Sequence, residues 1–309
     1  MRIFASTGPL FARPLDWALA VVADAGYDGA ELMVTQDPGT QDPERIRTAM
    51  AAEGVAIPVV HGPFLLITRR VFGTDPVEKA RRAIELAGGI GAELMIVHPP
   101  YRWQRRFHRW LLEDGDREAA AHGTRIGVEN LYPVTVRGRR VRFHRYTEPE
   151  HLLPFRHVVL DTSHFGVAGV DIVAAYDSLR DRAVHLHVSD YRGEGRDSHA
   201  PLGHGLLPLA GFLHLVGEDD RRAAASATVG AAVVPLVDTP SITLELDCRP
   251  YLDDRAALVG YLRQEREKCA ALLAGAPALE VLGRPDEVSV APGAAEDDAD
   301  QPTAGPARR

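Results

Sequence analysis

The chain has 309 residues, 45% of them hydrophobic, and its formal net charge is −8. No apolar run approaches the roughly 20 residues of a membrane-spanning helix, and the N-terminus lacks a secretory signal pattern, so we expect a cytoplasmic protein with no membrane partner. The acidic balance does not favour nucleic-acid binding, although a local basic cleft is compatible with it, and the two cysteines, Cys248 and Cys269, lack the spacing of a zinc knuckle or disulfide framework.

Eight short apolar runs are predicted to be β-strands. They span Arg2–Ser6, Gly29–Val34, Ala56–His61, Ala92–His98, Arg125–Glu129, His157–Asp161, Ala183–His187 and Ser241–Leu246. Helix-like segments lie between or after them at Pro14–Ala25, Asp42–Glu53, Pro76–Gly88, Asp171–Leu179 and Asp253–Leu273. Strands that alternate with helices are typical of a parallel sheet built from βαβ units. Eight units favour a closed (β/α)₈ TIM barrel over an open doubly wound sheet, as one domain at residues 1–274.

Two segments depart from this pattern. Residues 275–309 are rich in Pro, Gly, Ala and Asp, and they cannot bury enough apolar surface to offset the entropy of ordering. We therefore predict a disordered C-terminal tail. Residues 219–240, between the last two predicted strands, are expected to form an insertion or an extra helix.

Metal-ligand residue types stand at the end of each predicted strand from the third onward. They are His61, His98, Glu129, Asp161 with His164, His185 with His187, and Glu245 with Asp247. The active site of a (β/α)₈ barrel lies at the C-terminal ends of its strands, so these side chains are expected to converge. Converging carboxylates and imidazoles repel one another or stay unsatisfied unless an ion holds them. The mixed nitrogen and oxygen donors suit Zn²⁺, Mn²⁺ or Co²⁺.

The alternation of side chains along a strand distinguishes ligands from supporting residues. His185 and His187 share a face, and we expect His187 to be the ligand and His185 to pack behind it or lie near the substrate. Glu245 and Asp247 also share a face, and Glu245 is the expected ligand. For Glu31, in the second strand, a substrate contact in the cavity and a salt bridge in the barrel mouth remain alternatives.

The Gly-rich loop RGEGRDSHAPLGHG adds further candidates after the seventh predicted strand. Asp197 and His199 lie two residues apart, which places both side chains on one side of an extended segment. Beside the strand-end cluster they form a candidate further ligand pair. Arg192 and His204, in the same loop, are expected near the substrate.

Several motifs give the chain a family resemblance. Between Met1 and Ala274 it contains, in this order, HGPF, VHPP, VENLYP, LDTSHFGVAG, HLHVSD, DSHAPLGHG and LELD. Together these motifs resemble the xylose isomerase-like TIM barrel superfamily (AP endonuclease family 2). This superfamily includes sugar isomerases and epimerases as well as endonuclease IV-type AP endonucleases.

The resemblance implies one to three metal ions. In an endonuclease IV-like site, one ion would be held by His61, His98 and Glu129, a second by Glu129, Asp161, His187 and Glu245, and a third by His164, Asp197 and His199. In the isomerase and epimerase branch, one Mn²⁺-like ion would be held by Glu129, Asp161, His187 and Glu245, and His164 would contact the substrate.

The chain departs from both branches at a few positions. His204 stands in LGHG, where the nucleic-acid branch typically has LGEG. Thr135 and Gly193 stand near the places where ketose epimerases usually carry a further Glu and an Arg, and Arg192 is out of register. These positions match neither branch fully.

Two functions fit this pattern. The favoured hypothesis is a metal-dependent isomerase or epimerase of a small polar sugar or sugar phosphate, in which a metal-stabilised enediolate forms and Glu129 and Glu245 act as base and acid. The alternative is a multi-metal phosphodiesterase that acts on abasic DNA or another phosphoester. The segments YRWQRRFHRW and VRGRRVRFHRY support the alternative, because arginines with interleaved aromatics bind phosphate and stack bases. The filled ligand positions argue against a third class, a non-catalytic binding barrel.

Overall fold

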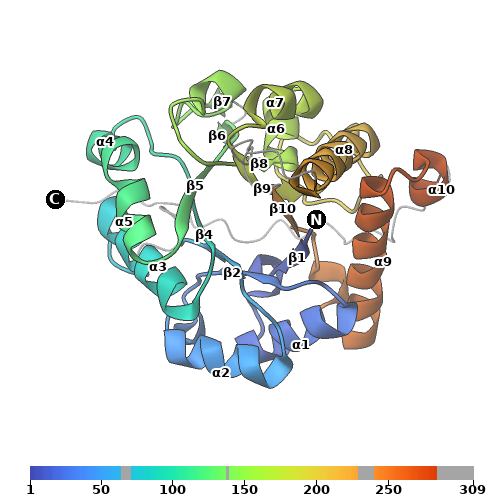
Figure 1. Cartoon of the computed structure of the whole chain (residues 1–309), viewed down its shortest axis with the longest axis horizontal. Helices are drawn as coiled ribbons and strands as arrows, with labels where there is room; N and C mark the ends of the chain where they lie inside the picture. Colours follow the sequence, from blue (N-terminus) through green and yellow to red (C-terminus); the bar gives the residue numbers. More distant parts are fainter. Residues whose placement is uncertain (64–70, 137–138, 229–239, 284–309) are drawn as a thin grey trace.

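The computed structural model describes residues 1–63, 71–136, 139–228 and 240–283, and its centre is a barrel of parallel strands (Figure 1). The barrel strands are β1 (Ile3–Ser6), β2 (Ala30–Met33), β3 (Val59–His61), β4 (Leu94–Val97), β5 (Arg125–Glu129), β8 (Val158–Asp161), β9 (Ala183–Val188) and β10 (Ser241–Leu244). They pair in the closed order β1-β10-β9-β8-β5-β4-β3-β2, with β1 bonded to both β2 and β10. The predicted (β/α)₈ TIM barrel is confirmed.

Each predicted strand overlaps an observed one, and the bounds differ for local reasons. β3 begins at Val59 instead of the predicted Ala56. Pro58 precedes it and has no amide hydrogen to give to a neighbouring strand. β10 ends at Leu244, although the amide of Glu245 still donates to the carbonyl of Val188 at 3.3 Å. Glu245 therefore remains fixed to the sheet although it lies beyond the strand.

The predicted helices form a layer outside the barrel (Figure 1). They are α1 (Leu15–Ala25), α2 (Pro43–Glu53), α3 (Pro76–Ile90), α7 (Ile172–Leu179) and α9 (Arg255–Leu273). α2, α3 and α7 begin directly after Asp42, Asp75 and Asp171, whose carboxylates accept hydrogen bonds from amides of the first turn. This capping satisfies donors that have no partner within the helix.

Other elements lie in connections for which no structure was predicted, except that residues 219–228 of the last one fall within the segment expected to form an insertion or an extra helix. They are α4 (Arg105–Glu113), α5 (Gly115–Ala121), the hairpin of β6 (Val134–Val136) and β7 (Arg139–Val141), α6 (Thr162–Ala168) and α8 (Leu209–Thr228). α4 begins within the first arginine-rich segment and ends at Glu113, and its buried apolar positions are only Phe107, Trp110 and Leu111. Because arginines surround these few apolar residues, the segment shows no clear helical periodicity in the sequence.

The interior of the barrel behind the C-terminal strand ends is apolar, and it supports the polar side chains at those ends. Its cluster consists of Phe4, Val59, Leu94, Ile96, Val159 and Val184. Gly127 leaves room for this packing, because a Cβ atom there would approach Val159 to 2.8 Å. The register between β8 and β9 shifts after Val158, and Val158 pairs with Ala183 while Val159 pairs with His185. Such a bulge re-aims side chains, and here Val184 joins the apolar cluster beneath the histidines of β9.

The two segments outside the barrel pattern are described in part. Residues 219–228 continue α8, in line with the expected extra helix, and residues 229–239 lie outside the described residues. Within the predicted tail, residues 278–282 form α10 (Ala278–Leu282), and Val281 and Leu282 pack against the core. Residues 284–309 lie outside the described part of the chain. Among the helices that the structure describes, none is long and apolar enough to span a membrane.

Candidate metal centre

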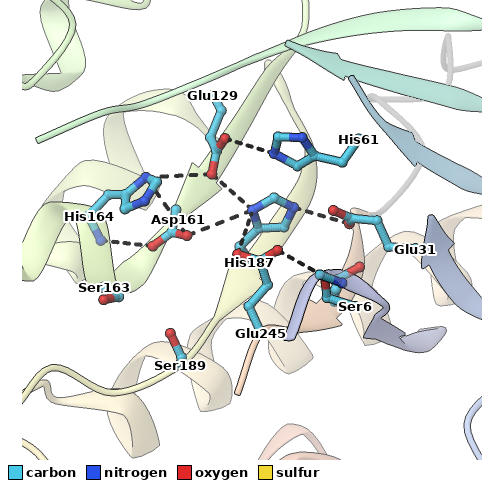
Figure 2. Close-up of polar contacts among 12 residues, drawn as sticks. Ser6, Glu31, His61, Glu129, Asp161, Ser163, His164, His187, Ser189 and Glu245 are labelled. Carbon is cyan, nitrogen blue, oxygen red and sulfur yellow. Dashed lines mark hydrogen bonds and ion pairs between the residues drawn. The ribbon is translucent and has the colours of Figure 1, made fainter. Parts of the chain in front are cut away.

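Polar side chains from around the barrel meet at the C-terminal ends of the strands (Figure 2). They come from every barrel strand or from the residue directly after it: Ser6, Glu31, His61, His98, Glu129, Asp161, His187 and Glu245. All are buried except His98, whose side chain is 11% exposed. The strand ends therefore bring imidazoles and carboxylates together away from bulk water.

Glu129 lies at the centre of this cluster (Figure 2). Its Oε2 atom is 3.3 Å from Nε2 of His61 and 3.1 Å from Nε2 of His98. Its Oε1 atom is 2.9 Å from Nδ1 of His187 and 3.5 Å from Nδ1 of His164. The two carboxylate oxygens of Glu129 thus face two different groups of potential metal ligands.

Among the described residues, three groups of side chains have ligand atoms within 4.8 Å of one another. The groups are His61 with His98 and Glu129, Glu129 with Asp161 and His187, and Glu31 with His61 and His187. The first is the complete first set that the resemblance implies, and the second contains three of the four residues of the second set. The fourth, Glu245, has its Oε2 atom 3.7 Å from Nδ1 of His187.

One buried oxygen indicates that this cluster fits a cation. Asp161 caps α6 through Oδ1, which accepts from the amide of His164 at 2.8 Å. Its Oδ2 atom is buried without a hydrogen-bond partner, 3.7 Å from Nδ1 of His187. A buried acceptor without a partner costs about 1–3 kcal/mol. A divalent cation would satisfy Asp161 Oδ2, and the oxygen and nitrogen donors around it suit Zn²⁺ or Mn²⁺.

The carboxylates and histidines shift one another's pKa values. Burial acts to raise the pKa of Glu129, but the adjacent His187, His61 and His98 outweigh it and hold that pKa well below its usual range. Burial also opposes the charge on His187, but Glu31, Glu245 and Glu129 raise its pKa well above the ordinary value. The pKa of Glu245, by contrast, is raised by burial. The two glutamates predicted as catalytic therefore have pKa values displaced in opposite directions.

The third set implied by the resemblance lies beside this cluster. Asp197 Oδ2 is 3.3 Å from Nε2 of His164 and 2.9 Å from Nε2 of His199. Ser163 donates a hydrogen bond to the other oxygen of Asp197. Burial would lower the pKa of His199, but Asp197 raises it to about 9. His199 has a left-handed backbone (φ 41°) and a buried Nδ1 without a hydrogen-bond partner. The predicted loop pair therefore does reach the strand-end cluster.

The residues predicted near the substrate have different positions. Arg192 is exposed, and its amide donates to Ser198 in the same loop. His204 is partly buried, and its pKa is lowered by burial and by the charges of Lys268 and Arg192. Neither residue belongs to the groups of ligand atoms described above.

Glu31 and His185 have no exposed surface that a substrate could reach. Of the two alternatives for Glu31, the structure places it in ion pairs, with Oε2 3.2 Å from His185 Nε2 and 3.1 Å from His187 Nε2. His185 lies below His187 on β9 and contacts Thr243. Asp247, predicted to be structural, pairs with Arg249 at 2.8 Å.

Sequence analysis missed two polar residues that hold candidate ligands in place. Ser6 donates to Glu245 Oε1 at 3.1 Å. Asn130 donates to the carbonyl of Asp161 and accepts from its amide, at 3.1 and 2.7 Å. Asn130 directly follows Glu129 in the VENLYP motif, which was the available signal. Ser6 ends an apolar strand, and a lone serine there carries no recognisable pattern.

A closed barrel with a polar cluster at its strand ends has the architecture of an enzyme fold. Comparison with known families identifies which one: residues 19–227 match the family model described as xylose isomerase-like TIM barrel. The chain belongs to this family, as its motifs indicated.

Individual relatives agree with this membership. An uncharacterized protein of Mycobacterium leprae is 30% identical over 243 residues, which cover 71% of this chain and 85% of that protein. Among solved structures, a D-tagatose 3-epimerase-like protein matches with a TM-score of 0.57 and 20% identity, over 87% of this chain and 99% of its own. An L-ribulose 3-epimerase matches with a TM-score of 0.60 and 16% identity, over 88% and 94%. At these identities the structural likeness shows the fold alone.

Proposed function

We propose that the protein is a divalent-metal-dependent isomerase or epimerase of a small sugar or sugar phosphate. The observation that carries this proposal is the convergence of Glu129, Asp161, His187 and Glu245 around one point at the barrel mouth, where Asp161 has a buried oxygen without a partner. The family membership and the sugar epimerases among its structural relatives support it.

The four residues that would hold the cation are Glu129, Asp161, His187 and Glu245. A bound divalent cation supplies Lewis-acid stabilisation of the negative charge that develops on a substrate carbonyl oxygen. Zn²⁺ and Mn²⁺ both accept this mixture of donors. The burial of the cluster would exclude water from the reacting carbon and strengthen the electrostatic interactions there.

Proton transfer falls to Glu129 and Glu245, which extend from β5 and from the end of β10. These two strands are separated by β8 and β9 in the barrel order, so the two carboxylates approach the centre from different sides. One would accept the proton from the carbon next to the carbonyl, and the other would return a proton to the opposite face or to the neighbouring carbon. The raised pKa of Glu245 favours its protonated form, which suits the proton donor, and the lowered pKa of Glu129 keeps it ionised and able to accept a proton.

His164 is the expected substrate contact in this centre. Its side chain lies beside Tyr132, with ring centroids 4.7 Å apart. His61 and His98 approach Glu129 from the opposite direction, and in a one-ion centre they would contact substrate hydroxyls. Both roles require only hydrogen-bonding nitrogens near the mouth, which a sugar substrate can use.

The first experiment is elemental analysis of the protein, purified without chelators or metal-affinity steps. We expect one Mn²⁺, Co²⁺ or Zn²⁺ ion per chain. A screen of ketoses and their phosphates in D₂O would then detect deuterium at the epimerised or isomerised carbon. A chain that binds no divalent cation after reconstitution, or that exchanges no substrate proton in any sugar, would contradict the proposal.

A second function, phosphodiester cleavage, is favoured by the ligand sets beyond the four-residue centre. His61 and His98 complete one further set with Glu129, and Asp197 joins His164 to His199 in another. Clustered cations neutralise a phosphate and activate water. Two to three zinc ions per chain together with cleavage of abasic DNA would favour this function over the first.

The basic connections on the mouth side also bear on this alternative. Tyr101 and Trp103 stack with ring centroids 5.0 Å apart, and the Trp103 side chain is 61% exposed. The amide of Arg102 donates to the carbonyl of Phe143, which joins the two arginine-rich segments. Part of the basic charge is neutralised internally, since Arg106 pairs with Asp75 at 2.7 Å. The exposed aromatic stack could hold a base or a sugar ring, so it fits both functions.

A further inference from the structure

His187 presents its two ring nitrogens to two different carboxylate groups (Figure 2). Nδ1 faces the proposed cation position, 2.9 Å from Glu129 and 3.7 Å from both Asp161 and Glu245. Nε2 faces the other way, 3.1 Å from Oε2 of Glu31. Glu31 therefore lies behind the ring, on the side away from the three carboxylates.

A carboxylate accepts hydrogen bonds and does not donate them, so the contact with Glu31 requires a proton on Nε2 of His187. Without a cation, Nδ1 also faces a carboxylate, that of Glu129, and a bound cation would replace the proton that this second contact requires. A neutral imidazole with its proton on Nε2 has a free lone pair on Nδ1. A cation ligand needs that lone pair. The hydrogen bond to Glu31 thus selects the tautomer in which Nδ1 can bind a cation, and it also fixes the rotation of the ring.

Glu31 is itself held by a second histidine. Nε2 of His185 lies 3.2 Å from the same Oε2 atom of Glu31 and 2.8 Å from Oγ1 of Thr243. On the other side of that ring, Nδ1 lies 2.8 Å from Oγ of Ser241. The network joins β2, β9 and β10, and the Glu31 and His185 side chains have no exposed surface. Because each partner is fixed by a strand, Glu31 cannot easily turn away from His187.

We propose that Glu31 is a positioning residue, which holds His187 in the orientation and tautomer required for cation binding. This inference rests on the proposed function in one respect, namely that His187 binds the cation. Carboxylates behind a ligating histidine typically contribute a factor of about 10 to 100 in metal affinity.

The same contacts allow a second role for Glu31. Its ligand atom lies within 4.8 Å of those of His61 and His187, so Glu31 could itself bind a cation. The two roles predict different behaviour in a double-mutant cycle. A residue that acts only through His187 has no effect on metal affinity once His187 has been replaced, whereas a direct ligand retains its effect.

The test measures Zn²⁺ affinity by competition with a chromophoric chelator. The proteins compared are the wild type, Glu31→Gln, His187→Asn and the double variant. We expect Glu31→Gln to weaken Zn²⁺ binding about 10- to 100-fold, and we expect no further loss when it is added to His187→Asn. In ¹⁵N NMR spectra of the zinc-bound wild type, the His187 ring should carry its proton on Nε2, and Glu31→Gln should alter that signal.

The matched control is Glu265→Gln. Glu265 is also a buried carboxylate, 1% exposed, but it accepts from the amide of Leu202 and pairs with Lys268, away from the cluster. This variant should keep the wild-type Zn²⁺ affinity even if it lowers the melting temperature. If Glu31→Gln does not fold, Glu31→Asp keeps the charge but shortens the reach to His187, and it should weaken Zn²⁺ binding by a smaller factor.

The outcomes separate this inference from the proposed function. Wild-type Zn²⁺ affinity in both Glu31 variants would overturn the positioning role, and so would equal losses from Glu31→Gln with and without His187. If the wild-type chain binds no divalent cation at all, the proposed function fails first. If the wild type binds the cation and only the Glu31 results disagree, the proposed function stands and the positioning role falls.

Discussion

Glu129 is the residue on which the proposed ligand sets depend most, because each of its oxygens faces a different group of side chains. His61 and His98 approach Oε2, while His187 and His164 approach Oε1. It is buried and has several charge partners, and its replacement changes charge in a site with little water. In the proposed function, its removal would therefore affect metal binding and proton transfer together.

We predict that Glu129→Gln lowers turnover by at least about 100-fold, because the amide neither accepts a substrate proton nor supplies a charged ligand. Zn²⁺ or Mn²⁺ binding should weaken in the same variant, as measured by elemental analysis after dialysis. The control is Glu113→Gln, which changes an exposed glutamate of α4 and should behave as the wild type. Full turnover with retained metal in Glu129→Gln would show that the site is assigned incorrectly.

His144 makes the free energy of unfolding depend on pH. Nε2 of this buried ring donates to the carbonyl of Tyr132 at 3.0 Å, and Nδ1 accepts from the amide of Tyr146 at 3.3 Å. Only the neutral ring with its proton on Nε2 can make both hydrogen bonds. Burial, with smaller contributions from His164 and His98, lowers the pKa of His144 to about 4.

The unfolded chain has a histidine pKa near 6.5, so between about pH 6.5 and pH 4 it binds a proton that folded His144 does not. The contribution of His144 is therefore complete above the unfolded pKa and is lost as the pH falls below it. Going from about pH 7.5 to about pH 5.5, this one group should remove about 1.3 kcal/mol from the free energy of unfolding.

Urea unfolding at these two pH values checks this prediction. In His144→Gln the loss of stability between them should be smaller than in the wild type by that amount, whatever the variant's absolute stability. His151→Gln, which changes an exposed histidine, serves as the control and should keep the wild-type difference. An unchanged pH dependence in His144→Gln would contradict the assignment of a neutral ring.

At the scale of elements, the loop after β9 is organised by one carboxylate. Asp190 accepts from the amides of Gly203, Gly205 and Leu207 at 3.1, 3.0 and 3.0 Å. Its own amide and carbonyl pair with Ala200. These bonds close the loop that carries Asp197 and His199, in which Asp197 reaches His164 and pairs with His199.

We predict that Asp190→Asn loosens this loop. The asparagine side chain has one acceptor oxygen instead of two, and its NH₂ group would face backbone amides, which are also donors. The expected loss is about 1–3 kcal/mol in the free energy of unfolding. Hydrogen exchange at the amides of residues 203–207 should accelerate more than exchange in α3. Asp171→Asn, which alters the cap of α7 instead, is the matched control, and equal exchange at residues 203–207 in both variants would contradict this role.

The sequence predicted the barrel elements well because their signals are local. The strands are apolar runs, and α2, α3 and α7 follow capping aspartates. The hairpin of β6 and β7 carries no such signal, and the capping aspartate of α6 stands at the end of a strand, where it indicated a metal ligand instead. Their formation depends on contacts made by the folded barrel, such as Asp161, which ends β8 and caps α6 at once.

The candidate site could be predicted from the sequence for a related reason. Residues at the ends of parallel strands converge whatever the details of packing. The partners of Glu31 could not be predicted, because its contact with His185 and His187 crosses the barrel interior from β2 to β9. The register shift beside Val184 also depends on pairing with β8, which strand alternation alone does not reveal.

At the scale of the whole molecule, the proposed cation joins residues from strands that are far apart in the sequence. A ligand that binds only the folded state stabilises it by about 2.7 kcal/mol at 100 times its dissociation constant. For a domain of this size, such an increase raises the melting temperature by roughly 5 °C or more.

We therefore predict that removal of divalent cations with a chelator lowers the melting temperature, and that added Zn²⁺ or Mn²⁺ restores it in a concentration-dependent way. Scanning calorimetry or dye-monitored melting measures the change. Glu129→Gln, treated identically, should show little dependence on the cation. Identical melting curves for chelated and metal-loaded wild type would contradict a cation bound within the barrel.

The pairing of β1 with β10 also determines when the barrel can close during synthesis. Ile3 pairs with Ile242, and Ser6 donates a hydrogen bond to Glu245. The first strand therefore cannot form these contacts until the ribosome has synthesised some 240 further residues. At about 5–20 residues per second, that interval lasts roughly 10–50 seconds. Throughout this time one edge of β1 has no neighbour, and the candidate metal centre lacks Glu245. A nascent chain of this protein therefore passes through a stage in which the sheet is still open and prone to association, and the residues of the proposed cation site are not yet complete.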